Sequence, residues 1–265
     1  MKAIILAAGQ GTRLAPITDD RPKCLVELGG RSLLDHQILT LKSQGITDIT
    51  VIAGYLAESI TVRGFRLVVN QDFASSNMVY TLFCADDLFA GDADLLISYG
   101  DIVYEPRVLR ALLASNAPMS VVVDREWRRY WELRMDDPLS DAETMKIDSF
   151  GMITELGKKP RGYKEIQGQY IGLIKVRRDR VVSLRRLYEA MDPDGTFDGR
   201  THKQMFMTSF VQHAINNGWP VEAVQISNGW LELDTYAELE LYRRMEAEGT
   251  LTDFFRFNPT LEDEH

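Results

Sequence analysis

Short apolar runs alternate with segments of helical period through the first half of the chain, and this alternation limits the folds open to it. Residues 2–6, 49–53, 65–69, 95–99 and 120–123 have the apolar, β-rich composition of strands. Residues 33–41, 78–88 and 109–113 have helical spacing, and Gly45 follows the first of these segments as a stop signal. Strands that alternate with helices predict an α/β fold, with a mostly parallel sheet and crossover helices.

The pattern changes after residue 123. Residues 124–143 are rich in Trp, Tyr, Arg and Asp without a clean period, and we interpret them as an inserted cap or lid over the edge of the sheet. Strands are expected near 144–148, 152–155, 170–176, 221–226 and 230–233, and helices at 181–191, 210–217 and 236–248. We predict one domain, residues 1–249, and a polar tail, residues 250–265, whose Phe254, Phe255 and Phe257 pack either internally or at a homodimer interface.

Composition and charge exclude several classes of protein. Apolar residues make up 45% of the 265 residues, which suffices for a full core. The formal net charge is −9 without a long basic run, so nucleic acid and anionic membranes are not expected partners. The N-terminal apolar run is shorter than a signal-peptide core, and no stretch approaches the ~20 apolar residues of a membrane span. Cys24 and Cys84 do not make a disulfide framework, and we predict a cytoplasmic protein that acts on small molecules.

A glycine-containing segment follows the first predicted strand and reads Leu6-Ala7-Ala8-Gly9-Gln10-Gly11-Thr12-Arg13-Leu14. Its backbone N–H groups would lie at the carboxyl edge of the sheet, where glycine lets the backbone approach phosphate oxygens. It is not a P-loop, because no Gly-Lys-Ser/Thr follows at the required spacing. It is not the dinucleotide fingerprint either, because Leu14 replaces the third glycine. Taken alone, the segment is explained equally well by a tight turn.

Two cations near this segment suit a polyphosphate ligand. Arg13 can contact two phosphate oxygens with its planar guanidinium, whereas Lys23, which follows Pro22, carries a compact point charge. The alternative for each is a solvated surface charge.

The segment 6–14 with Arg21-Pro22-Lys23 resembles the signature of the sugar-phosphate nucleotidylyltransferases. Gly100-Asp101 and Leu231-Glu232-Leu233-Asp234-Thr235 extend the resemblance over almost the whole chain. It implies a doubly wound core with helices on both faces of the sheet. It also implies transfer of a nucleotidyl group from an NTP to a phosphorylated acceptor, with release of pyrophosphate. Arg13 and Lys23 are then the expected catalytic residues, and the nucleotide-binding segment comprises Leu6, Ala7, Ala8, Gly9, Gly11, Thr12 and Arg13.

Two aspartates each follow an apolar strand. Asp101 and Asp234 are therefore expected at the carboxyl edge of the sheet, where α/β proteins bind ligands. Carboxylates and phosphate oxygens together form a hard-oxygen site suited to Mg²⁺, whereas a chain with scattered histidines does not suit zinc. The alternative for each aspartate is a turn or N-cap residue. In the family that the chain resembles, the matching pair holds the catalytic magnesium, which implies the same role for Asp101 and Asp234.

A further group of polar residues is expected to bind the nucleotide. Asn70, Ser76 and Asn77 fall in the region that reads the base in relatives, and Gly100 and Asp101 complete the predicted nucleotide site. The alternative for Ser76 or Asn77 is an N-cap. The Asn-x-x-Tyr-x-Leu pattern that starts at Asn77 resembles bacterial choline-phosphate cytidylyltransferases and their relatives that act on phosphonates or other small phosphorylated metabolites. This resemblance favours CTP as the nucleotide.

The predicted insertion is expected to contact the acceptor. Trp127, Tyr130 and Trp131 can hold an ammonium group by cation–π attraction, with Asp141 or Glu143 close by. The alternative is a helix face packed on the core, because Trp127 and Trp131 are four residues apart. The arginines of the insertion would instead suit an anionic acceptor.

A lysine-proline segment supplies the remaining acceptor residues. Gly157-Lys158-Lys159-Pro160 resembles the segment that holds the acceptor phosphate in the family, which assigns Lys159 to that phosphate. Tyr170 belongs to the strand that follows this segment in relatives, and we assign it to the acceptor as well. An exposed lysine pair before a turn is the alternative for Lys159.

Three functions follow from these observations. The first is a Mg²⁺-dependent cytidylyltransferase that uses CTP and a small acceptor such as phosphocholine or aminoethylphosphonate. The second is a sugar-1-phosphate nucleotidylyltransferase that uses UTP or dTTP. The third is a non-catalytic regulatory subunit, which predicts loss of the charged residues, yet Arg13, Lys23, Asp101 and Asp234 are all present. Attack of an acceptor phosphate on the α-phosphorus requires positioning and nearby cations rather than a covalent intermediate.

Overall fold

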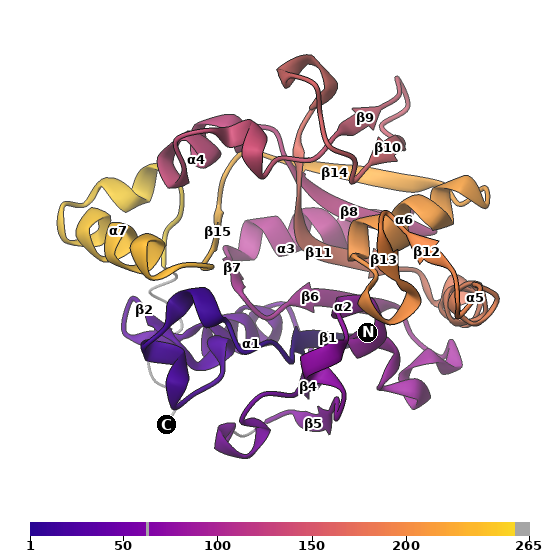
Figure 1. Cartoon of the computed structure of the whole chain (residues 1–265), viewed down its shortest axis with the longest axis horizontal. Helices are drawn as coiled ribbons and strands as arrows, with labels where there is room; N and C mark the ends of the chain where they lie inside the picture. Colours follow the sequence, from indigo (N-terminus) through magenta and orange to yellow (C-terminus); the bar gives the residue numbers. More distant parts are fainter. Residues whose placement is uncertain (62–63, 258–265) are drawn as a thin grey trace.

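A computed structural model describes residues 1–61 and 64–257, and within them seven strands form the central sheet (Figure 1). They are β1 (Lys2–Ala7), β4 (Asp48–Ala53), β5 (Arg66–Val69), β6 (Leu95–Tyr99), β8 (Met119–Asp124), β11 (Gln169–Val176) and β14 (Val221–Ile226). Their order is β14-β8-β11-β6-β1-β4-β5. Strand β11 runs antiparallel to β6 and β8, whereas the other neighbouring pairs are parallel. The prediction of a mostly parallel sheet is confirmed.

Helices cover both faces of this sheet. One face packs against α1 (Leu33–Ser43), α3 (Pro106–Ala114), α4 (Trp127–Arg134) and α7 (Tyr236–Ala247). The other packs against α2 (Met78–Phe83), α5 (Arg178–Glu189) and α6 (Met207–Asn216). Alternate side chains of β1 enter the two cores, with Ile5 in the first and Ile4 in the second. Burial on both faces explains the continuous apolar sequence of β1, and the doubly wound arrangement is confirmed.

The order of the strands reverses beside β1, because β4 and β5 extend the sheet on one side and β6 on the other. Open α/β sheets bind ligands at such a switch point. The loop after β6 starts at Gly100, which lies so close to β1 that a Cβ there would come within 2.7 Å of the carbonyl oxygen of Leu6. The fold therefore places the loops after β1 and β6 at one crevice.

A short antiparallel ribbon stands beside this crevice. It consists of β7 (Ile102–Tyr104) and β15 (Trp230–Glu232), with Ile102 opposite Glu232. The N–H of Leu233 donates a hydrogen bond to the carbonyl oxygen of Asp101 at 3.0 Å. Backbone pairing thus brings together two segments that lie 130 residues apart in the sequence.

Shorter elements complete the described structure. The hairpin of β9 (Met145–Ile147) and β10 (Ile153–Leu156) projects at one end of the molecule (Figure 1). Two further ribbons pair β2 (Glu27–Leu28) with β3 (Arg31–Ser32), and β12 (Thr196–Phe197) with β13 (Arg200–Thr201). No helix within the described residues has the length and apolarity needed to cross a membrane.

The segment 124–143, predicted as a cap or lid, packs on the core through its helix α4. Its helix α4 buries Trp127, Tyr130 and Trp131, whose exposed fractions are 4%, 1% and 4%. These residues and Arg134 follow the i, i+3, i+4, i+7 spacing of one helix face, and the charged residues between them conceal that period. Phe254 packs on Tyr130 with ring centroids 6.1 Å apart, so the first part of the predicted tail belongs to the core. Residues 258–265 of that tail lie outside the described residues.

Candidate active site

A pocket opens between the loops after β1 and β6. Several residues predicted to bind the nucleotide form its wall, and Lys23 and Met78 contribute to it as well. The predicted residues in this wall are Leu6, Ala7, Ala8, Gly9, Ser76, Asn77, Gly100 and Asp101.

Other residues of the predicted nucleotide site do not line this pocket. Asn70 is 1% exposed and donates from its amide nitrogen to the hydroxyl oxygens of Ser76 and Thr81, each at 2.9 Å. It therefore holds Ser76 in place and does not line the pocket. Gly11 has a φ of 73°, and a Cβ there would come within 2.9 Å of the Cβ of Lys23. Glycine is required at this position because the lysine side chain passes over it. Thr12 begins the short 3₁₀ turn that follows, outside the wall.

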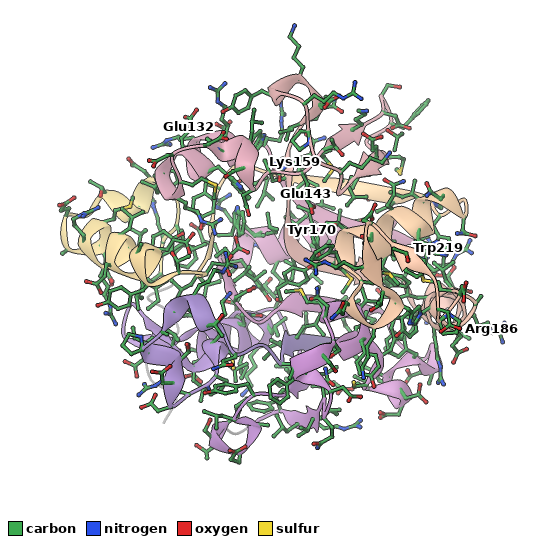
Figure 2. All side chains as sticks on the ribbon, viewed as in Figure 1. Glu132, Glu143, Lys159, Tyr170, Arg186 and Trp219 are labelled. Atoms are coloured by element: carbon green, nitrogen blue, oxygen red, sulfur yellow. The ribbon has the colours of Figure 1, made fainter. Side chains whose placement is uncertain are left out.

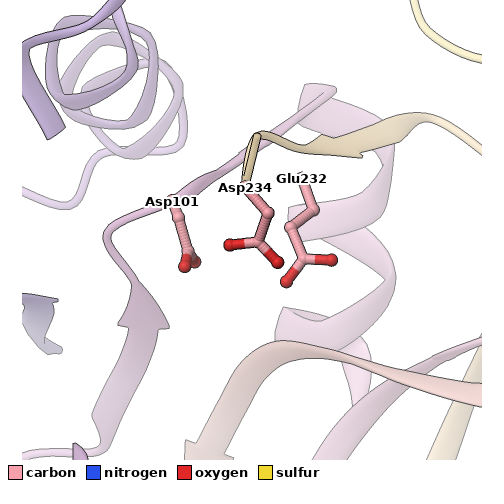
Figure 3. A group of neighbouring side chains, drawn as sticks. All are labelled: Asp101, Glu232 and Asp234. Atoms are coloured by element: carbon pink, nitrogen blue, oxygen red, sulfur yellow. The ribbon is translucent and has the colours of Figure 1, made fainter. Parts of the chain in front are cut away.

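Three carboxylates meet beside the pocket in the part of the chain that the structure describes. Oxygen atoms of Asp101, Glu232 and Asp234 lie within 4.8 Å of one another (Figure 3). Asp101 comes from the loop after β6, whereas Glu232 ends β15 and Asp234 follows two residues later. Side chains two residues apart in an extended segment share a face, so Glu232 and Asp234 point the same way. Glu232 is a candidate ligand that was not predicted from the sequence, although its alternation with Asp234 pointed to it.

Lys23 bridges two of these carboxylates. Its ammonium donates to Asp101 Oδ2 at 2.8 Å and also to Asp234 Oδ1. Burial disfavours the charged lysine, but the carboxylates of Asp101 and Asp234 outweigh it and raise the pKa of Lys23 above its usual value. Burial likewise opposes ionisation of Asp234, yet Lys23 lowers the pKa of that carboxyl. Lys23 and Asp234 are therefore both charged at neutral pH.

Two arginines approach the same cluster from different sides. Arg13 lies 3.1 Å from Asp234, with 66% of its side chain exposed. Arg134, at the end of α4, is only 2% exposed and lies 2.8 Å from Glu232, 2.6 Å from Glu238 and 3.8 Å from Asp234. Burial raises the pKa of Glu232, and Arg134 opposes that rise. From the sequence, Arg134 is only one of several arginines in the segment 124–143, and its place in the carboxylate network depends on helix α4.

A second pocket adjoins the first at Asn77 and Met78. Its wall is aromatic and acidic, and none of its described lining residues is a lysine or arginine. The aromatic residues are Tyr99, Trp131, Tyr170, Phe206 and Trp230, and the acidic residues are Asp141, Glu143 and Glu232. Four residues predicted to bind the acceptor therefore lie together: Trp131, Asp141, Glu143 and Tyr170.

Glu143 is fixed in this second pocket by its backbone. The side chain of Gln169 accepts from the N–H of Glu143 at 3.0 Å and donates to its carbonyl oxygen at 2.6 Å. Thr208 donates to the carboxylate at 3.3 Å, but no described cation forms an ion pair with it. Burial raises the pKa of Glu143 to about 7. The hydroxyl of Tyr170 is also buried and lacks a hydrogen-bond partner among the described residues. Figure 2 labels both side chains near the middle of the molecule.

Three residues predicted to bind the acceptor lie elsewhere. Trp127 and Tyr130 belong to the core, where the Tyr130 hydroxyl lies 2.6 Å from that of Tyr242 and does not line the pocket. The expected cage of three aromatic rings on the insertion is therefore corrected, because only Trp131 reaches the pocket. The ammonium of Lys159 donates to the carbonyl oxygens of Leu139 and Ser140, the latter at 2.9 Å, and borders neither pocket. Its position supports the turn before Asp141 instead of a phosphate.

A ligand crevice at the switch point of a doubly wound sheet, next to clustered carboxylates, defines a nucleotide-binding protein of the transferase type. A family model described as the MobA-like NTP transferase domain matches residues 3–191. The chain belongs to this family and is a nucleotidyltransferase.

Known relatives agree with this assignment. The CTP:phosphoglutamine cytidylyltransferase of Campylobacter jejuni is 40% identical over 252 residues, which cover 91% of this chain and 98% of the relative. The choline-phosphate cytidylyltransferase of Streptococcus pneumoniae is 45% identical over 102 residues, which cover 36% of this chain and 44% of the relative. The solved structure of the inositol-1-phosphate CTP transferase from T. maritima has the same fold, with a TM-score of 0.67, 19% identity, and coverage of 92% of this chain and 96% of that one.

Proposed function

We propose that this nucleotidyltransferase transfers CMP from CTP to a small phosphorylated acceptor, releases pyrophosphate and requires Mg²⁺. One observation carries the proposal: the carboxylate cluster borders both pockets. Asp101 lines the first pocket and Glu232 lines the second, so charged groups stand where the contents of the two pockets would meet. The use of CTP by the Campylobacter and Streptococcus relatives supports CTP as the nucleotide.

The carboxylate cluster suits a hard divalent cation. Oxygen donors are what Mg²⁺ prefers, and Oδ1 of Asp101 is buried without a hydrogen-bond partner among the described residues. Asp101, Glu232 and Asp234 would hold the ion. When bound, it supplies positive charge to phosphate oxygens.

The chain's own groups bind and orient the triphosphate. The residues after β1 line the first pocket together with Lys23, and Arg13 adds a second cation next to the carboxylate cluster, 3.1 Å from Asp234. Negative charge grows on phosphoryl oxygens as the acceptor attacks, so fixed cations at that point lower the barrier. A single group of this kind typically contributes about 10²–10³-fold in rate. We expect losses of this size in Lys23→Ala and Asp234→Ala, with near-native circular dichroism.

The test is pyrophosphate release with each NTP against a panel of phosphorylated acceptors. CTP is expected to react with at least one small acceptor, among phosphocholine, 2-aminoethylphosphonate and phosphorylated amino acids. Turnover confined to UTP or dTTP with a sugar phosphate would refute the proposal in favour of a sugar-1-phosphate nucleotidylyltransferase. Omission of Mg²⁺ in the presence of a chelator is expected to abolish the reaction.

The second pocket favours an acceptor with a positively charged end. Glu143 is ionised in part at neutral pH, is largely shielded from water and has no cationic partner among the described residues. An ammonium group would supply that partner, and the faces of Trp131 and Tyr170 would add cation–π attraction.

A matched pair of acceptors tests this preference. 2-Aminoethylphosphonate and ethylphosphonate differ by the amine, and the first is expected to have the lower KM. A hydrogen bond to a charged group contributes about 1.5–3 kcal/mol, so Glu143→Gln should raise the KM for the amine by ~10–100-fold and leave that for CTP unchanged. Equal KM values for the two acceptors in the native enzyme would contradict the preference. Homodimer formation and a cytoplasmic location stay predictions of the sequence.

A further inference from the structure

The ammonium of Lys23 lies between two of the carboxylates assigned to the metal. It is 2.8 Å from Asp101 Oδ2 and also donates to Asp234 Oδ1, and the three side chains are only 12–17% exposed. Mg²⁺ contacts its oxygen ligands at about 2.1 Å, so an ion held by Asp101 and Asp234, even on the unpartnered Oδ1 of Asp101, would lie close to the ammonium. Two cations held at such distances from one pair of oxygens would repel each other strongly. Lys23 and a divalent ion therefore cannot both occupy this position.

The cations around the cluster differ in their freedom to leave. Arg134 is 2% exposed and is fixed on its far side by Glu238. Lys23 lines the nucleotide pocket, and its flexible four-carbon stem can carry the ammonium towards an anion in that pocket. The phosphates of a nucleotide provide such an anion. Lys23 is thus the cation that a nucleotide would draw away.

We propose that Lys23 and the divalent cation compete for Asp101 and Asp234, so that metal loading depends on the nucleotide. This inference rests on the proposed function. Before the nucleotide arrives, Lys23 neutralises the two aspartates and keeps metal affinity low. Nucleotide phosphates give the lysine a new partner and free the aspartates. Metal and nucleotide then bind with positive coupling, and each raises the affinity for the other by the same factor.

The test measures binding of Mn²⁺ alone to the full chain, from the electron paramagnetic resonance signal of the free ion. Lys23→Met removes the competing charge and keeps an apolar stem of similar length. The variant lacks the charge-assisted hydrogen bonds that Mn²⁺ has to displace in the native protein, so Mn²⁺ should bind to the variant ~10–100-fold more tightly. A non-hydrolysable CTP analogue should tighten Mn²⁺ binding to the native protein much more than to the variant.

Arg13→Met is the matched control, because it removes a charge 3.1 Å from Asp234 that is mostly exposed. Its Mn²⁺ affinity is expected to change about twofold or less, since exposed ion pairs contribute little. Circular dichroism checks folding, and Lys23→Gln replaces Lys23→Met if the latter does not fold.

The outcomes separate this inference from the proposed function. Tighter Mn²⁺ binding in the lysine variant but not in Arg13→Met supports competition. Competition is overturned if the native protein and the lysine variant bind Mn²⁺ with equal affinity, or if Arg13→Met gains as much Mn²⁺ affinity as the lysine variant. The proposed function stands in either case. Failure of both proteins to bind Mn²⁺, with or without the CTP analogue, overturns the metal assignment and the inference together.

Discussion

Replacement of Arg134 by methionine should be among the most destabilising changes near the active site. The guanidinium lies 2.6 Å from Glu238 and 2.8 Å from Glu232 with 2% of the side chain exposed. At an effective dielectric constant near 20, each attraction at these distances exceeds about 4 kcal/mol. Desolvation of the buried ions offsets most of that gain, but removal of one partner leaves carboxylates buried without compensation. The expected loss is therefore about 3–5 kcal/mol in the free energy of unfolding.

Chemical denaturation at pH 8 measures this loss, and a control comes from the same helix. Arg128 is 56% exposed and pairs with Glu132, so Arg128→Met should cost only about 0–1 kcal/mol. The penalty in Arg134→Met should shrink towards pH 5. Burial already raises the pKa of Glu232, and without Arg134 that carboxyl takes up a proton more readily in the folded state. A loss below about 1 kcal/mol, or one no larger than that of Arg128→Met, would refute the assigned role of Arg134.

Three further changes probe the acceptor side. Glu143→Gln should stabilise the protein above pH 7 by up to roughly 3 kcal/mol and have no effect near pH 4. Burial raises the folded-state pKa of Glu143 to about 7, so ionisation of the native carboxyl lowers the stability of the protein as pH rises from 4.5 through 7. Thermal unfolding across this pH range measures the effect. Lys159→Ala should raise the acceptor KM about 3–10-fold, because the ammonium of Lys159 holds the turn before Asp141. Lys158→Ala should leave that KM unchanged. Equal effects of the two substitutions in steady-state kinetics would contradict the role of Lys159. Trp127→Ala should lower the free energy of unfolding by about 3–5 kcal/mol without a selective change in acceptor KM, and a selective KM effect would return Trp127 to the acceptor site.

The strands of the sheet and the position of the nucleotide loop could be predicted because local physics dictates them. β1 is buried on both faces, so its sequence is a continuous apolar run, and the glycines after it permit the turn and the passage of Lys23. Asp101 and Asp234 were predictable for a similar reason, since each follows an apolar strand whose end lies at the ligand-binding edge.

The choice between a packed helix face and an aromatic cage at Trp127, Tyr130 and Trp131, and the place of Arg134, could not be decided in the same way. The period of Trp127, Tyr130 and Trp131 is interrupted by charged residues, one of which, Arg134, is buried because three carboxylates surround it. Secondary-structure propensity and hydrophobic pattern do not reveal that these carboxylates compensate the buried charge of Arg134. The carboxylates belong to β15, α7 and the segment between them, more than 90 residues later in the chain. The hydrogen bonds that the Lys159 ammonium donates to backbone carbonyl oxygens likewise depend on how a turn about twenty residues earlier packs. Tertiary contacts, not local sequence, decide these positions.

The ribbon of β7 and β15 makes the reaction centre depend on a segment near the C-terminal end of the described residues. The segment matched by the family model, residues 3–191, includes β6 and most of β1. It possesses one carboxylate of the trio, and the other two arrive only when residues 230–232 pair with residues 102–104. The reaction centre therefore depends on residues beyond the matched segment, and a protein clipped before residue 230 would lack two of its three carboxylates.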